Sequence, residues 1–250
     1  MTAVVFIHGI GGAARVWAGQ VRSFAAEGFE PAALDLPGYG GRPPVDTLHF
    51  DGLAADVETQ IEARGLDRPV LVGHSMGGMV AQTMLRRRPG GYRAAVLACT
   101  SPAFGNADGE FQKTFVADRI GPLDAGKTMA ELAPGLVARM VGPAVVPVGR
   151  AFAVSVMSAV PPATYRAAVR CLVTFDERAA LAGIRIPVLC LAGEADRTAP
   201  AQVMERMAAR IPGARFVTLP SAGHLPNVET PAAFDAAILA FLRQALAPAT

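Results

Sequence analysis

Short apolar runs alternate with amphipathic segments along most of this chain, and this alternation constrains the fold more than any other feature. Apolar runs of strand length are followed by stretches in which apolar residues recur at helical spacing. The expected strands are 2–8, 31–36, 69–73, 94–98, 187–192 and 215–219, and the expected helices are 15–27, 50–64, 76–87, 200–210 and 231–246. Such a series predicts an α/β fold with a mostly parallel sheet and helices on both faces.

The alternation stops between residues 101 and 183. No strand is expected there, several helices are, and Thr128 and Glu131 have the spacing of a capping box. A chain of 250 residues can bury one full core. We therefore expect an α/β core of residues 1–100 and 184–250, with a helical insert at 101–183 after the strand at 94–98.

Charge and cysteine content exclude several classes of protein. The formal net charge of +2, from 23 basic and 21 acidic residues, predicts no nucleic-acid surface. Cys99, Cys171 and Cys190 are odd in number and far apart, which favours reduced thiols over disulfides or a metal site. No apolar stretch has the length of a membrane span, and the first residues lack a signal-peptide pattern. We expect a cytoplasmic protein without membrane partner, metal or cofactor.

The motif Gly73-His74-Ser75-Met76-Gly77 stands between an expected strand and an expected helix. It fits a sharp turn with a serine at the apex, flanked by glycines because the turn leaves no room for larger residues. This geometry lifts the Ser75 hydroxyl clear of the sheet and directs a helix N-terminus toward the reacting group. The motif predicts that Ser75 is a nucleophile.

A serine nucleophile requires a base to take its proton and a carboxylate to fix the tautomer of that base. Of the four histidines, His224 is the expected base, because it lies in a loop of small residues after the last strand. His74 adjoins Ser75, but neighbours at such a turn point apart. Glu194 competes for the role of the acid, and loop geometry favours Asp196. All three expected groups follow strands, whose carboxyl ends share one edge of a parallel sheet.

Two backbone N–H groups are expected to hold the oxyanion that forms when an ester carbonyl is attacked. One belongs to Met76, at the start of the helix after Ser75. The other is expected from Ile10, in the loop after the first strand. His8, at the head of that loop, is expected to shape it by hydrogen bonding.

A dinucleotide-binding protein is an alternative from a different class. Residues 9–14 fit G-x-G-x-x-A after a strand, and Asp35 ends the next strand, where an acid would hold a ribose. Against this hypothesis, His8 stands where such sites usually have an apolar residue, and Pro37 follows Asp35 closely. The hypothesis also leaves the expected serine, acid and histidine unexplained.

Five motifs occur in series: His8-Gly9, Asp35-Leu36-Pro37-Gly38-Tyr39-Gly40, Gly73-His74-Ser75-Met76-Gly77-Gly78, Gly193-Glu194-Ala195-Asp196 and Gly223-His224-Leu225-Pro226. Together they resemble the signatures of the α/β-hydrolase superfamily. The chain looks most similar to the 3-oxoadipate enol-lactonases and small carboxylesterases, especially in the tail from residues 181–184 to residues 231–234. The resemblance implies that the insert is a helical cap over the active site, which sets substrate choice.

The resemblance implies a hydrolase of small-molecule esters or enol-lactones with the triad Ser75, Asp196 and His224 and no cofactor. Two alternatives stay open: a carbon–carbon bond hydrolase of a vinylogous diketone, and a slow-turnover homologue that binds a signalling ligand. The first alternative is disfavoured by Leu225, since such enzymes tend to have tryptophan after the histidine.

Family members usually have two antiparallel strands before the strand that ends in His-Gly, whereas here that strand is expected to begin at Thr2. An exposed sheet edge would favour a second copy as a partner, so a homo-oligomer is possible. Apolar cap residues are candidates for an acyl pocket, and Arg139, Arg166 and Arg170 for pairing with a substrate carboxylate. The candidate apolar residues are Met129, Met140, Met157, Phe104, Phe111, Phe115, Phe152 and Tyr165.

Overall fold

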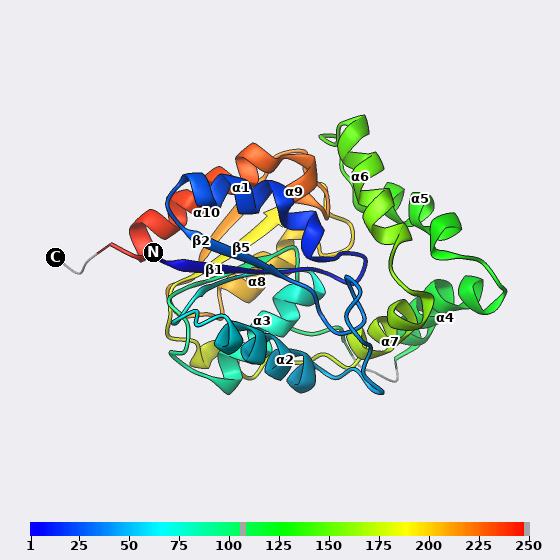
Figure 1. Ribbon diagram of the computed structural model, residues 1–250, viewed down its shortest axis with the longest axis horizontal. Helices are drawn as coiled ribbons and strands as arrows, with labels where there is room; N and C mark the ends of the chain where they lie inside the picture. The colour runs from blue at the N-terminus through cyan, green and yellow to red at the C-terminus, as the bar shows by residue number, and fades with distance from the viewer. Residues whose placement is uncertain (106–108, 248–250) are drawn as a thin grey trace.

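A computed structural model describes residues 1–105 and 109–247, so residues 106–108 of the expected insert and 248–250 of the expected core lie outside the described part. At its centre is a sheet of six parallel strands in the order β2-β1-β3-β4-β5-β6 (Figure 1). The strands are β1 (Ala3–Ile7), β2 (Glu30–Leu34), β3 (Val70–His74), β4 (Ala95–Ala98), β5 (Val188–Gly193) and β6 (Arg215–Leu219). The predicted fold class is confirmed.

Helices cover both faces of the sheet, because alternate side chains of each buried strand point to opposite sides. On one face, Val4 and Phe6 of β1 join a cluster with residues of α1 and α10, and on the other Val5 joins a cluster with residues of α2, α3 and α8. Figure 1 shows these two layers. The helices are α1 (Ala18–Ala26), α2 (Phe50–Ala63), α3 (Met76–Arg87), α8 (Ala201–Ala208) and α10 (Pro231–Ala245).

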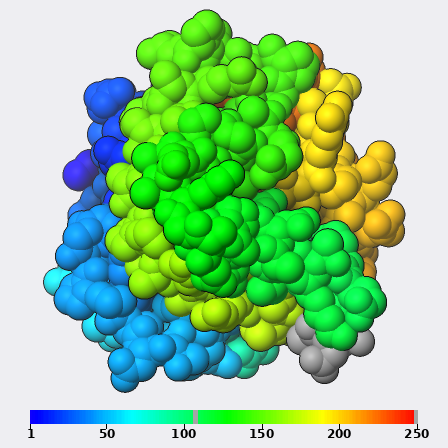
Figure 2. Space-filling model, turned by 90° about the vertical axis from the view of Figure 1, so that its right-hand side faces the viewer, coloured from blue at the N-terminus to red at the C-terminus, as the bar shows by residue number. Residues whose placement is uncertain are grey.

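In the described part of the chain between β4 and β5, four α-helices lie beyond the carboxyl ends of the strands (Figures 1 and 2). They are α4 (Glu110–Asp124), α5 (Met129–Met140), α6 (Pro147–Ser158) and α7 (Pro162–Leu172), called the cap below. The capping box at Thr128 and Glu131 starts α5, as predicted. In the described part of residues 101–183, extended pairing is limited to one antiparallel bridge between Ala103 and Asp176.

Three short elements differ from the expected ones. The helix expected at 15–27 begins as a 3-10 turn, η1 (Ala14–Trp17), whose first N–H, that of Ala14, donates to the Asp35 carboxylate at 2.7 Å. A short helix, α9 (Pro226–Glu229), was not predicted, since four residues are too few for a periodic pattern. A second 3-10 turn, η2 (Leu181–Gly183), precedes β5. None of the helices in the described ranges is long and apolar enough to cross a membrane.

Candidate active site

Ser75 lies at the tight turn between β3 and α3. Its backbone is in the left-handed region, with φ of 53° and ψ of −120°, a conformation that costs a non-glycine residue about 1–3 kcal/mol. A Cβ atom at Gly77 would overlap the Ile7 carbonyl, which explains why the turn requires glycine there. The Ser75 carbonyl accepts a hydrogen bond from the Thr100 hydroxyl at 2.8 Å, so the strained turn is fixed from outside.

The structure brings Ser75, His224 and Asp196 into one hydrogen-bonded chain. The Ser75 hydroxyl lies 3.0 Å from Nε2 of His224, and Nδ1 of His224 lies 2.8 Å from Oδ2 of Asp196. The Nδ1–H group donates to the carboxylate, which leaves Nε2 free to accept the serine proton. His224 and Asp196 are both buried, whereas the serine side chain faces a cavity.

The charge of Asp196 is stabilised inside the protein. Burial raises the pKa of this carboxyl, but the charge and hydrogen bond of His224 and two backbone donors outweigh burial and lower the pKa below its usual value. Those donors are the N–H groups of Thr198 and Ala199, at 2.7 and 3.0 Å from Oδ1. Glu194 instead points to the Ser221 N–H and is exposed. The geometry therefore favours Asp196 over Glu194 as the partner of the histidine.

His74 positions the backbone of His224 rather than contacting the serine hydroxyl. Burial, helped by the neighbouring His224, lowers the pKa of His74 to about 3, so its ring is neutral. Its Nε2–H donates to the His224 carbonyl at 2.5 Å. The His224 N–H donates to the carbonyl of Met140, the last residue of α5, at 2.7 Å. The histidine is thus held by the core on one side and by the cap on the other.

Glu229 also supports the His224 loop, and sequence analysis missed it. Its carboxylate is buried and accepts three backbone hydrogen bonds. The donors are the N–H groups of Gly142 at 2.7 Å, Leu225 at 2.8 Å and Gly223 at 2.9 Å. The sequence spacing does not reveal this role, because one donor, Gly142, lies in the insert, and the other two, Gly223 and Leu225, lie in the loop just before Glu229.

The predicted oxyanion donors lie beside Ser75. Ile10 and Ser75 line the same cavity, and Met76 is the first residue of α3. Within residues 1–105 and 109–247, neither the Ile10 N–H nor the Met76 N–H has a hydrogen-bond acceptor. Their role in catalysis stays a prediction.

Hydrogen bonds fix the loop that carries Ile10. His8 accepts from the Leu36 N–H through Nε2 at 3.2 Å and therefore donates through Nδ1 to the Gly9 carbonyl at 2.8 Å. Tyr39 donates from its hydroxyl to the Ile10 carbonyl at 2.9 Å. His8 shapes the loop in the way that the sequence predicts.

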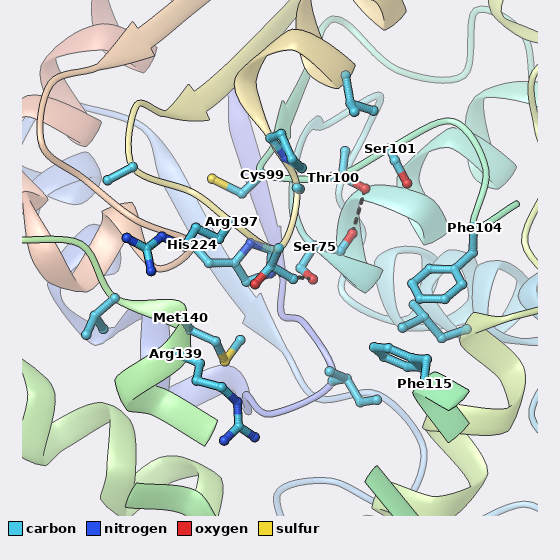
Figure 3. A pocket seen from close by; sticks show the side chains of 18 of the residues that line it. Ser75, Cys99, Thr100, Ser101, Phe104, Phe115, Arg139, Met140, Arg197 and His224 are labelled. Carbon is cyan, nitrogen blue, oxygen red and sulfur yellow. Dashed lines mark hydrogen bonds between the residues drawn. The ribbon is translucent and has the colours of Figure 1, made fainter. Parts of the chain in front are cut away.

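A cavity of 860 Å³ opens in front of the Ser75 hydroxyl, between the sheet edge and the cap. Figure 3 shows Phe104 and Phe115 on one side of the Ser75–His224 pair, and Arg139 and Arg197 on the other. Of the apolar cap residues considered from the sequence, those that line the cavity are Phe104, Phe111, Phe115 and Met140. Met129 and Tyr165 belong to the hydrophobic core, and Arg166 pairs with Asp124 instead of lining the cavity.

Neither a metal site nor a dinucleotide site is well formed around these residues. In the described part of the chain, His74, Cys99 and His224 bring three potential ligand atoms within 4.8 Å of one another. Both histidines already use ring nitrogens in the hydrogen bonds above, and burial raises the pKa of the Cys99 thiol, so a metal would displace those bonds. Asp35, which the dinucleotide-binding alternative would assign to a ribose, accepts a hydrogen bond from the Ala14 N–H.

The fold and the hydrogen-bonded chain of serine, histidine and aspartate define the class of α/β hydrolases. A model described as the alpha/beta hydrolase family matches residues 4–237, and the chain belongs to this family.

Two relatives and one solved structure place the chain within the family. It is 31% identical over 247 residues to "Polyketide synthase ThaQ" of Burkholderia thailandensis, covering 97% of this chain but only 12% of that relative. It is 26% identical over 261 residues to "Pimeloyl-[acyl-carrier protein] methyl ester esterase" of Pectobacterium atrosepticum, covering 96% of this chain and 94% of the other. The thermophilic esterase of Thermogutta terrifontis, solved with malate bound, matches with a TM-score of 0.89 and 25% identity over 98% of this chain and 90% of its own.

Proposed function

We propose that the protein is a serine hydrolase of small carboxylic esters or lactones, with Ser75 as nucleophile, His224 as base and Asp196 as the acid that orients the base. The observation that carries the proposal is the chain of two hydrogen bonds, 3.0 and 2.8 Å long, from the serine hydroxyl to a buried carboxylate. The ester-hydrolysing activities named for two of its relatives support it.

The reaction follows from the positions of these groups. Ser75 Oγ attacks the carbonyl carbon while His224 Nε2 takes the hydroxyl proton, and the N–H groups of Ile10 and Met76 hold the resulting oxyanion. When the intermediate collapses, the same nitrogen returns the proton to the departing alcohol. A lactone keeps that alcohol as part of the acyl chain. Water then gives its proton to His224, attacks the acyl-enzyme and releases the acid, and Ser75 regains its proton.

The nucleophile is tested with Ser75→Ala protein. We expect turnover of p-nitrophenyl butyrate to fall by at least about 10⁴-fold and labelling by a fluorophosphonate to stop, because the attacking oxygen is missing. Ser101→Ala serves as the control, since Ser101 lines the same cavity but donates its hydroxyl to the Ala103 carbonyl, and it should still be labelled. Labelling that persists on Ser75→Ala protein contradicts the proposal.

A substrate panel separates ester or lactone hydrolysis from the two alternatives. Short acyl esters, enol-lactones and a vinylogous diketone are given to the same purified protein. Sustained turnover of esters or lactones supports the proposal, whereas the diketone as the best substrate supports carbon–carbon bond hydrolysis. A burst of one product per protein molecule without further turnover supports the slow-turnover homologue.

A further inference from the structure

Three arginines, Arg119, Arg139 and Arg197, are among the residues that line the cavity in front of Ser75. Among the lining residues that lie in the described ranges, none is Asp, Glu or Lys. Many other arginines of the described chain are paired with carboxylates: Arg42 with Asp56, Arg86 with Asp51 and Glu177, Arg87 with Glu58 and Arg166 with Asp124. Within the described residues, none of the ion pairs involves Arg119, Arg139 or Arg197.

Two of these arginines lie on the same side of the reacting groups. Arg139 is in the last turn of α5, and Arg197 directly follows Asp196 in the chain. Figure 3 shows both on the side of His224 that is opposite to Phe104 and Phe115. Arg139 and Arg197 therefore face Phe104 and Phe115 across the cavity, with Ser75 between the two pairs.

Arg119 has different surroundings. Its guanidinium lies 4.7 Å from the ring centroid of Phe115, on the apolar side. It also lines a groove of 550 Å³ between α4 and α5, to which the acidic residues Asp118 and Glu131 contribute. Arg139 lines this groove too, and it also lines the active-site cavity together with Arg197; the described residues that line that cavity include no carboxylate.

We propose that Arg139 and Arg197 form a subsite for an anionic group of the substrate, a carboxylate or a phosphate, at the end remote from the scissile bond. The guanidinium group binds either anion through paired N–H donors. A concave site lined by positive charges attracts anions. The proposal rests on the hydrolase function proposed above. It narrows the substrate class to esters or lactones that carry an acidic group as well as an apolar part for the phenylalanine side.

Matched substrate pairs test the subsite by a ratio of rates. Monomethyl adipate is compared with methyl hexanoate for an anion on the acyl side, and the butyryl ester of 2-hydroxyethyl phosphate with ethyl butyrate for an anion on the alcohol side. We expect the wild-type kcat/KM to favour the anionic member of one pair by about tenfold, since a charge-assisted contact contributes about that factor. The preference should decrease as sodium chloride is raised, because both arginines are exposed.

Arg139→Gln and Arg197→Gln should each reduce this preference by about three- to tenfold, and the double variant should abolish it. Arg150→Gln is the matched control, because Arg150 is an exposed cap arginine on α6 that does not line the cavity, and it should keep the wild-type preference. The pair that responds identifies the side of the substrate that carries the anion. If neither pair shows a preference that depends on Arg139 and Arg197, the subsite does not exist.

Binding to Ser75→Ala protein separates failure of the subsite from failure of the hydrolase proposal. This variant should bind the anionic member of the responding pair more tightly than its neutral partner in calorimetric titration, and addition of Arg139→Gln and Arg197→Gln should remove the difference. Tighter binding of the anion without any wild-type turnover would uphold the subsite and reject the hydrolase. If wild-type protein turns over the neutral esters but Ser75→Ala protein binds the anionic and neutral members of each pair equally, the hydrolase is upheld and the subsite is rejected.

Discussion

Asp196 uses its two carboxylate oxygens for two different tasks. Oδ1 accepts from the N–H groups of Thr198 and Ala199, which fix the loop, and Oδ2 accepts from Nδ1 of His224. In Asp196→Asn protein the loop can keep its acceptor, but an amide N–H then faces His224 and favours the wrong tautomer. The Nε2 atom of His224 would then carry a proton and could not accept one from Ser75. We expect kcat for p-nitrophenyl butyrate to fall by about 10⁴-fold while the fold is retained.

Glu194→Gln provides the control for this prediction, since Glu194 lies in the same loop and contacts the Ser221 N–H instead of His224. Its kcat should stay within a few-fold of wild type. Near-normal turnover of Asp196→Asn protein, or a large loss in Glu194→Gln protein, would reassign the acid.

His74 makes stability depend on pH. Its folded pKa of about 3 lies below the value of about 6.5 for an unfolded histidine, so below pH 6.5 the unfolded chain binds a proton that the folded protein does not. The contribution of His74 to the free energy of unfolding is fully present above pH 6.5. It decreases by about 1.4 kcal/mol per pH unit as the pH falls toward 3. His74→Gln can still donate to the His224 carbonyl but cannot titrate. Urea unfolding gives the decrease in the free energy of unfolding between pH 7 and pH 5, and this decrease should be about 2 kcal/mol smaller in His74→Gln protein than in wild type. Equal decreases in the two proteins would contradict this prediction.

At the residue scale, sequence reasoning brings together Ser75, Asp196 and His224 because each follows a strand, and the structure places the three in hydrogen-bond contact. Their catalytic roles stay a prediction. Sequence reasoning does not reach Glu229, whose donors become neighbours only when the cap closes on the His224 loop. Sequence reasoning does not single out Arg197 for a similar reason. In the sequence it is one charged residue in the loop after Asp196, and its place in the cavity lining is seen only in the structure.

At the scale of elements, the turn between β3 and α3 depends on how closely the helix approaches the sheet. In Gly77→Ala protein the new methyl group would overlap the Ile7 carbonyl of the neighbouring strand β1. We expect this change to lower the free energy of unfolding by about 1–3 kcal/mol or more and to displace Ser75.

Gly135→Ala is the matched substitution, because Gly135 is also inside a helix, α5, but a Cβ atom there meets only Nη1 of the flexible Arg139 side chain, at 3.9 Å. It should raise the free energy of unfolding by about 0.5–1 kcal/mol. Urea denaturation measures both effects, and a Gly77→Ala protein as stable as wild type would show that α3 can move away from β1.

The elements that the sequence predicts well are those with a strong local pattern. Helix α3 and strand β6 have the predicted bounds, and the capping box begins α5 as expected. The 3-10 turn η1 is too short to show a periodic pattern, and the Asp35 carboxylate that accepts from its first N–H lies 21 residues away in the chain. The order of the strands depends on the pairing of segments far apart in the chain, since β1 lies between β2 and β3. Short-range periodicity cannot predict this order.

Across the whole molecule, the cap and the core share one hydrophobic cluster. It contains residues of the sheet and of α2 and α3 together with cap residues such as Val137, Met157 and Tyr165. The second cluster, under α1 and α10, contains Trp17, the sole tryptophan, packed against Phe6 and Phe234. Because cap residues belong to the same cluster as the sheet, loss of the cap would expose core surface.

We therefore expect the cap and the core to unfold in one transition. Trp17 fluorescence reports on the core, and far-UV circular dichroism includes the four cap helices, so both signals should have the same midpoint in urea. Met157→Ala tests the coupling, since Met157 is buried in the cap and its truncation should lower the free energy of unfolding by about 2–5 kcal/mol. If the cap and core are one cooperative unit, this cap substitution lowers the Trp17 midpoint as much as the dichroism midpoint. A shift in dichroism alone would mean that the cap unfolds independently.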